Sequence, residues 1–201
     1  HVIRVKLLGF FVGETGETCV IALVVTGSGA YTIQNGDLGS SNLDLTVFTD
    51  ATGTLTLDTS VSGGIGGLVK QGGGTLLLTG SSTYTGSTII GGGTLAVGSA
   101  SALAPTTAVV LADVASANLD ITGFNVTIGS LSGGGTGGGG VILGSNTLTV
   151  GADNTSTTYN GQISGTGGKL VKTGDGTLTL TSSSTFTGAA PVAQGIVNLR
   201  P

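Results

Sequence analysis

Short segments in which aliphatic and polar residues alternate recur along the chain, separated by turns made mostly of Gly, Ser, Thr, Asn and Asp. Leu43, Leu45 and Val47, for example, are separated by single polar residues. Successive side chains of a strand point to opposite faces, so the alternation places the aliphatic residues on one face and the polar residues on the other. The pattern predicts short strands at residues 31–33, 43–47, 54–57, 75–79, 87–90 and 94–97. The chain is therefore expected to be all-β.

The segment of residues 67–97 returns at residues 169–199 with a constant offset, 170 − 68 = 102. The recurring positions include Leu68, Lys70, Leu76, Tyr84 and Gly86 in the first copy and Leu170, Lys172, Leu178, Phe186 and Gly188 in the second. An offset without gaps indicates a structural module that stacks on copies and relatives of itself to bury its apolar face. We expect these residues to be structural repeat positions in modules near 61–99 and 163–201, with the shared aromatic packing a corner.

Two segments between the copies have unusual compositions. Residues 99–117 are rich in Ala, but Pro105 and several β-branched residues disfavour a helix, so strand and loop are expected there. Residues 133–140 read GGGTGGGG and resemble a linker. Because the residues that follow them repeat an earlier pattern, we interpret the glycines as tight corners between rungs of the solenoid.

Residues 1–25 differ from the remainder of the chain. Two apolar runs flank the polar segment Glu14-Thr15-Gly16-Glu17, which predicts a β-hairpin. A hairpin at the end of a solenoid covers strand edges that would otherwise pair with another chain, so residues 1–25 are expected to form a cap on the solenoid of residues 26–201. The alternative is an arm that pairs with the next subunit.

In the arm interpretation, the apolar N-terminus contacts the last rung of a neighbouring molecule. That rung, residues 195–199, is apolar and no atypical polar cap follows it. The predicted assembly contacts are Val2, Ile3, Val5, Phe10, Phe11, Ile196, Val197 and Leu199. Such contacts would build head-to-tail filaments.

Composition and charge exclude several classes of protein. The 201 residues include 40 Gly, and 8% are charged, but the hydrophobic fraction of 38% and a mean hydropathy of +0.46 argue against disorder. With six Lys and Arg and a net charge of −4, the chain has no basic surface for nucleic acid or for an acidic membrane. No apolar run approaches the roughly 20 residues of a membrane-spanning helix. Cys19 is the single cysteine, so an internal disulfide is excluded and a small buried side chain is expected.

The sequence offers no constellation of residues for catalysis. His1 is the single histidine, which excludes a Ser-His-Asp site, and no phosphate-binding loop is present. Carboxylates such as Asp44 and Asp58 are dispersed, and the Gly-rich runs lack the repeated Asp of calcium-binding turns. We therefore expect no catalytic, cofactor-binding or metal-binding residue and no enzymatic activity. The alternative that stays open is a carbohydrate-binding or carbohydrate-cleaving β-helix.

Three segments of the chain carry a family resemblance. They are LVKQGGGTLLLTGSSTYTGSTIIGGGTLAVGSASALA, ANLDITGFNVTIGSLSGGGT and LGSNTLTVGADNTSTTYNGQISGTGGKLVKTGDGTLTLTSSSTFTG. From residue 61 to residue 199 the chain resembles the passenger-associated repeats of bacterial autotransporters. The resemblance implies a right-handed parallel β-helix that is displayed outside a Gram-negative cell. The chain is then either a passenger fragment or a small secreted protein that carries the same repeat.

The resemblance and the composition together predict a non-enzymatic extracellular or cell-surface β-solenoid with a structural or adhesive role. Low charge gives little repulsion between copies, so self-association is expected, in adhesion, aggregation or a biofilm matrix. The expected partners are further copies of the chain and a host surface or glycan. No cofactor is expected.

Overall fold

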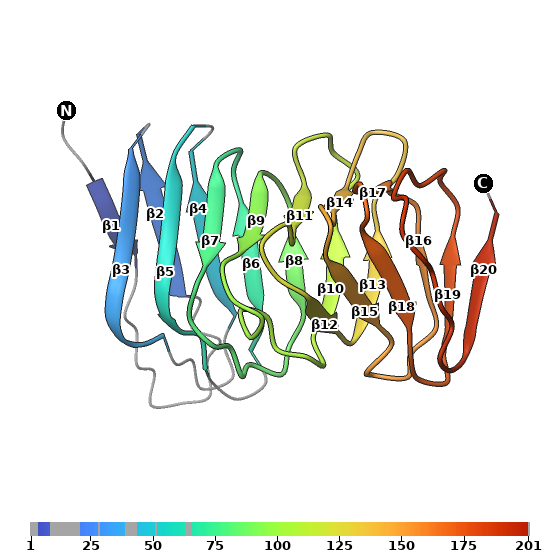
Figure 1. Ribbon diagram of the computed structural model, residues 1–201. Helices are drawn as coiled ribbons and strands as arrows, with labels where there is room; N and C mark the ends of the chain where they lie inside the picture. The colour runs from blue at the N-terminus through green and yellow to red at the C-terminus, as the bar shows by residue number, and fades with distance from the viewer. Residues whose placement is uncertain are drawn as a thin grey trace, which may run out of the picture.

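The computed structural model describes residues 4–8, 21–27, 29–38, 44–50, 52–62 and 66–200. Within these ranges every regular element is a strand and no helix is present. The strands stack in one direction along a single axis, with the two ends of the chain at opposite ends of the stack (Figure 1). The predicted all-β solenoid is confirmed.

The described strands form three sheets. The first sheet contains, in spatial order, β1 (Arg4–Leu8), β2 (Ile21–Thr26), β4 (Leu45–Thr49), β6 (Leu68–Gln71), β8 (Thr88–Ile90), β10 (Ala108–Leu111), β13 (Ser130–Gly133), β16 (Thr157–Tyr159), β19 (Thr177–Leu180) and β20 (Ile196–Leu199). The second sheet contains β17 (Ile163–Ser164), β14 (Gly140–Ile142), β11 (Asn118–Asp120), β9 (Thr94–Val97), β7 (Thr75–Leu78), β5 (Thr54–Ser60) and β3 (Ala30–Asp37). The third sheet contains β12 (Val126–Ile128), β15 (Thr147–Val150) and β18 (Lys169–Lys172).

Neighbouring strands in these sheets come from successive rungs, and they run parallel except where β1 pairs with β2. The length of a rung varies along the axis. The rung that leads from Thr75 to its partner Thr94 is markedly shorter than the rung that leads from Gly133 to its partner Tyr159. Corners of different length absorb this variation, so the strands stay in register while the loops differ.

The predicted N-terminal hairpin is present in the described part of the chain. β1 and β2 pair antiparallel, with Arg4 opposite Thr26 and Leu8 opposite Ala22, and β1 forms the outer edge of the first sheet. Val5 lies in β1, but its side chain is not among those that the structure describes. The other predicted N-terminal contacts and the cysteine lie outside the described residues: Val2, Ile3, Phe10, Phe11 and Cys19. β1 pairs with its own chain on one side only, and the choice between a cap and an arm stays a prediction.

The core is a stack of aliphatic side chains inside the solenoid. In the second sheet the inward residues Leu55, Leu76, Leu95, Leu119 and Val141 occupy paired positions on successive strands, and all are fully buried. Burial of each such side chain contributes about 1.5–3 kcal/mol relative to its exposure to water. The alternation seen in the sequence therefore determines which residues line the interior.

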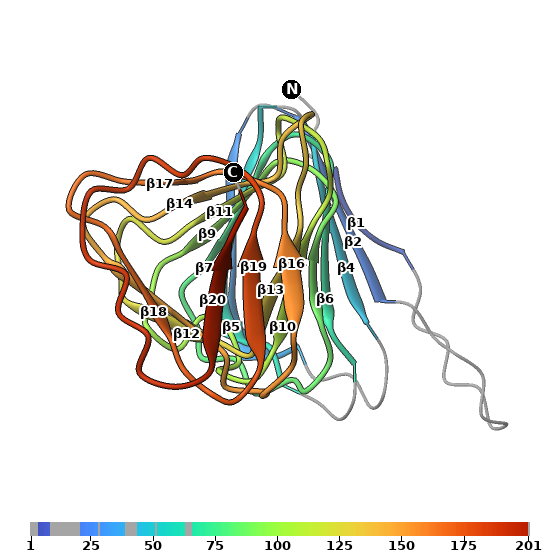
Figure 2. The same cartoon turned by 90° about the vertical axis from the view of Figure 1, so that its right-hand side faces the viewer.

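The number of faces changes along the axis. From β2 to β9 each described rung contributes one strand to the first sheet and one to the second. From β10 onward the rungs also contribute β12, β15 and β18 to the third sheet, which widens the cross-section in the view along the axis (Figure 2). The solenoid thus has a two-faced N-terminal part and a three-faced C-terminal part.

The two segments of unusual composition match their predictions. Residues 99–117 contain β10 within loop structure, and no helix is formed there. Residues 133–140 form a corner in which Gly135 and Gly138 are bridged antiparallel. Gly133 has a φ of +84°, and a Cβ at this position would collide with the carbonyl oxygen of Leu111, so a residue with a side chain is excluded.

The copies of the repeated module do not stack directly on each other, contrary to the simplest interpretation of the offset. β6 of the first copy lies in the first sheet, whereas its equivalent β18 lies in the third. β7 lies in the second sheet, whereas its equivalent β19 lies in the first. Following the strand pairing from Leu68 along the first sheet leads to Leu178, and not to the repeat equivalent Leu170. The first copy therefore begins on the first sheet, with Leu68. The second copy begins on the third sheet, with Leu170, and reaches the first sheet only at Leu178.

Candidate interaction site

The aliphatic repeat positions line the interior. Leu68 and Leu76 in the first copy and Leu170 and Leu178 in the second are all buried in the core. They lie in strands whose inward residues alternate with more exposed outward ones. These positions hold the rungs together, and Leu170 also lines a hollow at the C-terminal end of the solenoid.

The two lysines of the module are buried, with exposed fractions of 0% for Lys70 and 1% for Lys172. The Lys70 ammonium donates to the backbone carbonyls of Gln71 at 2.9 Å, Gly72 at 2.9 Å and, in the following rung, Gly92 at 3.0 Å. The Lys172 ammonium donates to the carbonyls of Thr173 and Gly174. Each lysine therefore satisfies corner carbonyls that face the interior.

The corners leave room for these ammonium groups because glycine faces them. Gly93 has a φ of +68°, and a Cβ there would lie 2.6 Å from Lys70 Nζ. Its repeat equivalent Gly195 has a φ of +77°, and a Cβ there would lie 2.9 Å from Lys172 Nζ. The glycines that recur with the lysine are thus part of the same arrangement.

Burial lowers the pKa of both lysines. The pKa of Lys70 falls from 10.5 to about 8 because the charged ammonium is removed from water. Burial also lowers the pKa of Lys172, although the negative charges of Asp153 and Asp175 oppose this shift. Sequence reasoning identified both lysines as repeat positions but missed their burial. The sequence does contain a sign of this burial. Lys70 lies two residues after the inward Leu68, and alternate residues of a strand point to the same face.

The aromatic repeat positions differ in their polar contacts. Tyr84 is buried, its hydroxyl lies 2.6 Å from the Thr88 hydroxyl, and the Thr88 hydroxyl lies 3.0 Å from the Thr107 hydroxyl. Thr107 donates in turn to the carbonyl of Gly86 at 2.9 Å. Burial raises the pKa of Tyr84 to about 12, an effect reduced by the hydrogen bonds. The burial of Tyr84 is what packing at a corner requires, and that role stays a prediction.

The second copy has no equivalent of this polar chain. Phe186 replaces Tyr84, Ala190 replaces Thr88, and Phe186 is only half-buried. Gly188, the equivalent of Gly86, donates its N–H to the carbonyl of Gly168 at 2.9 Å.

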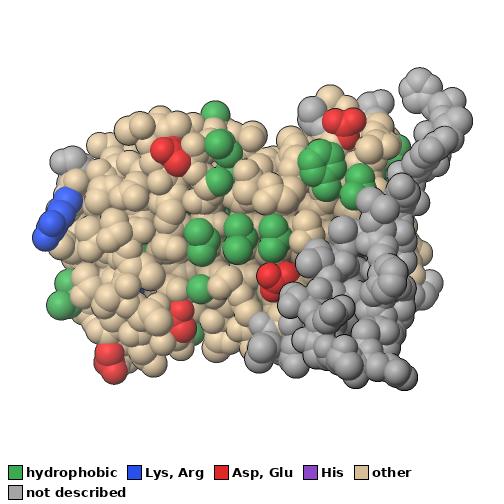
Figure 3. Space-filling view, turned by 180° about the vertical axis from the view of Figure 1, so that it is seen from behind, with side chains coloured by type: hydrophobic (Ala, Val, Ile, Leu, Met, Phe, Trp, Pro, Cys, Tyr) green, Lys and Arg blue, Asp and Glu red, His purple; other side chains and the backbone are tan. Residues whose placement is uncertain are grey.

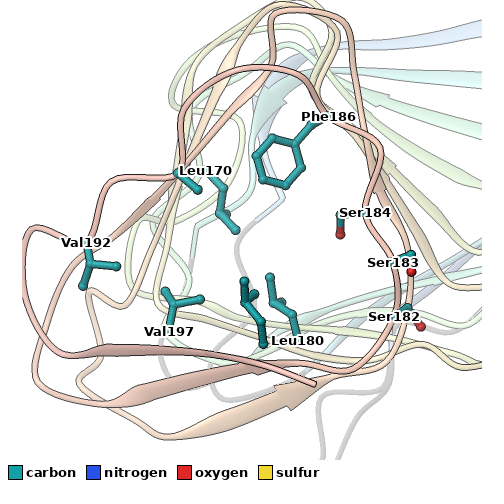
Figure 4. A pocket seen from close by; sticks show the side chains of 10 residues that line it. Leu170, Leu180, Ser182, Ser183, Ser184, Phe186, Val192 and Val197 are labelled. Atoms are coloured by element: carbon teal, nitrogen blue, oxygen red, sulfur yellow. The ribbon is translucent and has the colours of Figure 1, made fainter. Parts of the chain in front are cut away.

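The C-terminal end of the solenoid is an apolar surface with a hollow of about 550 Å³. Leu170, Leu180 and Phe186 point into this hollow, and Ser182, Ser183 and Ser184 line the side on which Phe186 lies (Figure 4). Of the predicted assembly contacts, Ile196 and Leu199 are exposed and Val197 is half-buried, and all three belong to the edge strand β20. Val197 and Leu199 line the hollow, whereas Ile196 does not, since neighbouring residues of a strand point to opposite faces.

A second apolar surface, which sequence reasoning missed, lies on the outer face of the first sheet. Val69, Ile89 and Val110 occupy paired outward positions on β6, β8 and β10, and Ile89 is exposed. Seen from behind the view of Figure 1, a row of hydrophobic side chains crosses the middle of the solenoid (Figure 3). Phe48 on β4 is a further exposed aromatic of this face. We call Val69, Ile89 and Val110 the outer stripe.

A polar hollow of about 480 Å³ lies beside the Gly-rich corner. Asn118, Gln162, Ser182 and Ser183 line it together with the backbone of residues 135–140. None of its lining side chains is charged. The hollow therefore lacks the paired carboxylates of a glycoside-cleaving site.

In the described part of the chain, Asp44 and Asp58 each accept a hydrogen bond from the following rung. Asp44 accepts from the backbone N–H of Gly67 at 2.7 Å beside the first sheet, and Asp58 accepts from the Thr79 hydroxyl at 2.9 Å on the second sheet. The two carboxylates therefore lie on different faces. Among the described residues, no three His, Cys, Asp or Glu side chains gather to hold a metal ion.

No helix in the part of the chain described by the structure is long and apolar enough to cross a membrane.

Comparison with known proteins supports the family resemblance. The repeat family described as Passenger-associated-transport-repeat matches residues 68–97 and 170–199, the two copies of the module. Among curated proteins, the Adhesin BmaC autotransporter of Brucella suis biovar 1 (strain 1330) is 41% identical over 175 residues, which cover 86% of this chain. The chain spans about 5% of the length of this relative. No solved structure matches the chain.

Proposed function

The chain belongs to the autotransporter passengers that carry passenger-associated-transport repeats, and on this premise we propose that it is an adhesive, non-enzymatic β-solenoid on the outer surface of a Gram-negative cell. The observation that carries the proposal is the 41% identity, over 86% of the chain, to a protein named as an adhesin.

The outer stripe is the part of the surface that we assign to adhesion. Val69, Ile89 and Val110 form a row along the axis, and their backbones are held in a regular parallel sheet. Apolar side chains on a rigid sheet are already ordered before binding, so contact with a partner costs little side-chain entropy. A host surface with exposed apolar groups is the partner that this stripe fits.

Adhesion is tested by coating beads with the purified chain and counting the beads that cultured epithelial cells retain. We expect the chain to increase retention over uncoated beads, and Ile89→Ser to reduce it. Leu77→Ser is the matched control, because Leu77 is a half-buried outward residue on the second sheet. Retention equal to that of uncoated beads would contradict the adhesive role, and equal loss in both variants would contradict the assignment to the outer stripe.

Self-association into head-to-tail filaments stays a prediction. The exposed residues of the edge strand β20 favour association. The two ends of the solenoid do not match each other in their strands, which argues against head-to-tail contact. The C-terminal end carries edges of three sheets, but the described strands at the N-terminal end belong to two, and β1 there runs antiparallel to β2. Light scattering of the chain with and without residues 1–25 decides the point, since arm-to-edge contacts require a decrease in mass when the arm is removed.

A further inference from the structure

The polar hollow beside the Gly-rich corner is produced by two corners of different length. Residues 134–139 connect β13 of the first sheet to β14 of the second, whereas the shorter segment 160–162 connects β16 to β17 in the following rung. Thr136 and Gly137 at the tip of the longer corner are exposed, while Gly161 of the shorter corner is buried. The longer corner therefore projects from the side of the solenoid, and the hollow of about 480 Å³ opens beside it.

Rungs of the chain enclose this hollow on both sides. Ala115 and Asn118 belong to the rung before the projecting corner, and Ser182 and Ser183 belong to the rung after the short one. The hollow is thus a feature of the side of the solenoid. Its volume falls in the range of roughly 300–1,000 Å³ that is usual for ligand sites.

Hydrogen bonds hold the projecting corner in place. The Gly137 N–H donates to the Asp113 carboxylate at 2.6 Å. The Gly139 N–H donates to the Val114 carbonyl at 3.0 Å, and from the following rung the buried Tyr159 hydroxyl donates to the Gly139 carbonyl. This wall of the hollow is therefore formed before any ligand arrives, and binding loses little conformational entropy there.

The side chains that line the hollow keep hydrogen-bonding groups available. The Asn118 Nδ2 donates to the Ser116 carbonyl at 3.1 Å. The Gln162 Nε2 donates to the Ser183 carbonyl at 3.5 Å. Within the described part of the chain, neither amide oxygen accepts a hydrogen bond. Because Thr136 and Ser183 are exposed, their hydroxyls can also contact a molecule in the hollow.

The chemistry of the lining matches a neutral ligand that is rich in hydroxyl groups. An ionic ligand would find no charged partner in the hollow, and an apolar ligand would find Ala115 as the one apolar side chain of the lining. An amide presents a donor and an acceptor in one plane, and a hydroxyl serves as either. Neighbouring hydroxyls of a sugar ring fit this arrangement, because each can donate to an amide oxygen or accept from an amide N–H.

We propose that the hollow binds a short neutral glycan, with the amides of Asn118 and Gln162 hydrogen-bonded to its hydroxyls and the backbone of residues 135–140 forming the adjoining wall. The glycan is bound and not cleaved, because no carboxylate lines the hollow. The site lies at the corner between the first and second sheets, apart from the outer stripe on the face of the first sheet. Glycan binding therefore does not depend on adhesion through the stripe.

The test titrates the isotope-labelled chain with the neutral trisaccharides maltotriose, cellotriose and mannotriose and follows its amide NMR spectrum. We expect at least one sugar to shift the backbone amide signals of residues 135–140 and the side-chain amide signals of Asn118 and Gln162. Because no aromatic ring lines the hollow, the Kd is expected to be on the order of 1 mM. The proposal is overturned if none of the sugars shifts these signals at about 10 mM, or if the tripeptide Ala-Ser-Gly shifts them and the sugars do not.

Variants of the lining locate the bound sugar. Gln162→Leu removes an amide at an exposed position, so it should keep the melting temperature of the original chain and weaken sugar binding at least about fivefold. Ser183→Ala, a milder second variant, should weaken binding about twofold. Gln194→Leu is the matched control with unchanged affinity, because Gln194 is an exposed glutamine in the corner before β20 and does not line the hollow.

The two surfaces are separated by the same titration. Ile89→Ser should leave sugar binding unchanged, because Ile89 belongs to the outer stripe and not to the hollow. Equal affinity of the original chain, Gln162→Leu and Ser183→Ala would place the sugar elsewhere and overturn the site.

Discussion

The first copy of the module lies on the first and second sheets and the second copy on the third and first, yet the inward residues of their first strands, β6 and β18, are the same. Leu68 and Leu170, and Lys70 and Lys172, are buried in both places. Outward residues are less constant, since Leu77 corresponds to Thr179 and Ile89 to Pro191. The repeat therefore encodes an interior, and the surface above it is free to vary from copy to copy.

The copies also differ in their surroundings, because a further coil covers only the first. Variants at equivalent positions separate the contribution of the module from that of its cover.

Replacement of the same inward residue should be costly only in the covered copy. Ile90→Ala opens a cavity between β8 and its neighbours and is expected to lower the free energy of unfolding by about 3 kcal/mol. Val192→Ala, at the half-exposed equivalent position, should cost less than about 1 kcal/mol. Urea unfolding followed by circular dichroism measures both. Similar losses would mean that the C-terminal end is as well packed as the interior.

Removal of a buried lysine should lower the free energy of unfolding, because the corner carbonyls lose their hydrogen-bond donor. Lys70→Met leaves the carbonyls of Gln71, Gly72 and Gly92 without the ammonium and is expected to cost about 2 kcal/mol. Lys172→Met should cost about two thirds as much, because that ammonium donates to two carbonyls, those of Thr173 and Gly174, instead of three.

The same urea titrations measure both lysine variants, with Lys169→Met as the control for loss of charge. Lys169 is an exposed residue of β18, so its replacement should change stability by less than about 0.5 kcal/mol. A loss in the control equal to that of Lys70→Met would assign the effect to net charge.

Stability should rise with pH through the titration of Lys70. Its pKa is about 8 in the folded chain and 10.5 as the ordinary value expected in the unfolded chain. Above pH 8 the folded state therefore holds fewer protons than the unfolded state, so the free energy of unfolding increases with pH until 10.5 is reached. Between pH 7 and pH 9 the gain is on the order of 1 kcal/mol. Urea unfolding at the two values should show it, and Lys70→Met should reduce it.

The exchange of the two aromatics should have the smallest effect. Tyr84→Phe removes the partner of the buried Thr88 hydroxyl and is expected to cost somewhat less than about 1 kcal/mol, since Thr88 keeps Thr107. Phe186→Tyr, at the half-buried equivalent, should be neutral. Thermal unfolding of both variants provides the measurement. A larger loss from Phe186→Tyr than from Tyr84→Phe would contradict the looser packing around Phe186.

Alternation along the chain was sufficient to predict the strands and the aliphatic lining, because strand geometry fixes the direction of every second side chain. It did not predict the rotation of the second copy by one face. Because rung length varies along the axis, an offset along the sequence is a poor measure of turns around that axis. The outer stripe was missed for the same reason, since Val69, Ile89 and Val110 become neighbours only when the rung length is known.

The lysines were missed for a different reason. Lysine is rarely buried without a partner, so its usual exposure argued against an interior position. Here the partners are backbone carbonyls at glycine corners, which no side-chain motif reveals. An inward-phased lysine directly before a Gly-rich corner is the pattern that would have identified them.

The direction of the backbone hydrogen bonds has a mechanical consequence. The rungs pair through parallel strands stacked along the axis, and the two ends of the chain lie at opposite ends of that axis. Tension between the ends therefore pulls along the hydrogen bonds and separates the outermost rung from its single neighbour before the next rung is affected. Each detached rung adds the length of its own unfolded chain to the distance between the two ends. A solenoid built in this way yields to force in small steps and lengthens, as a tether does, while the remaining rungs keep their structure.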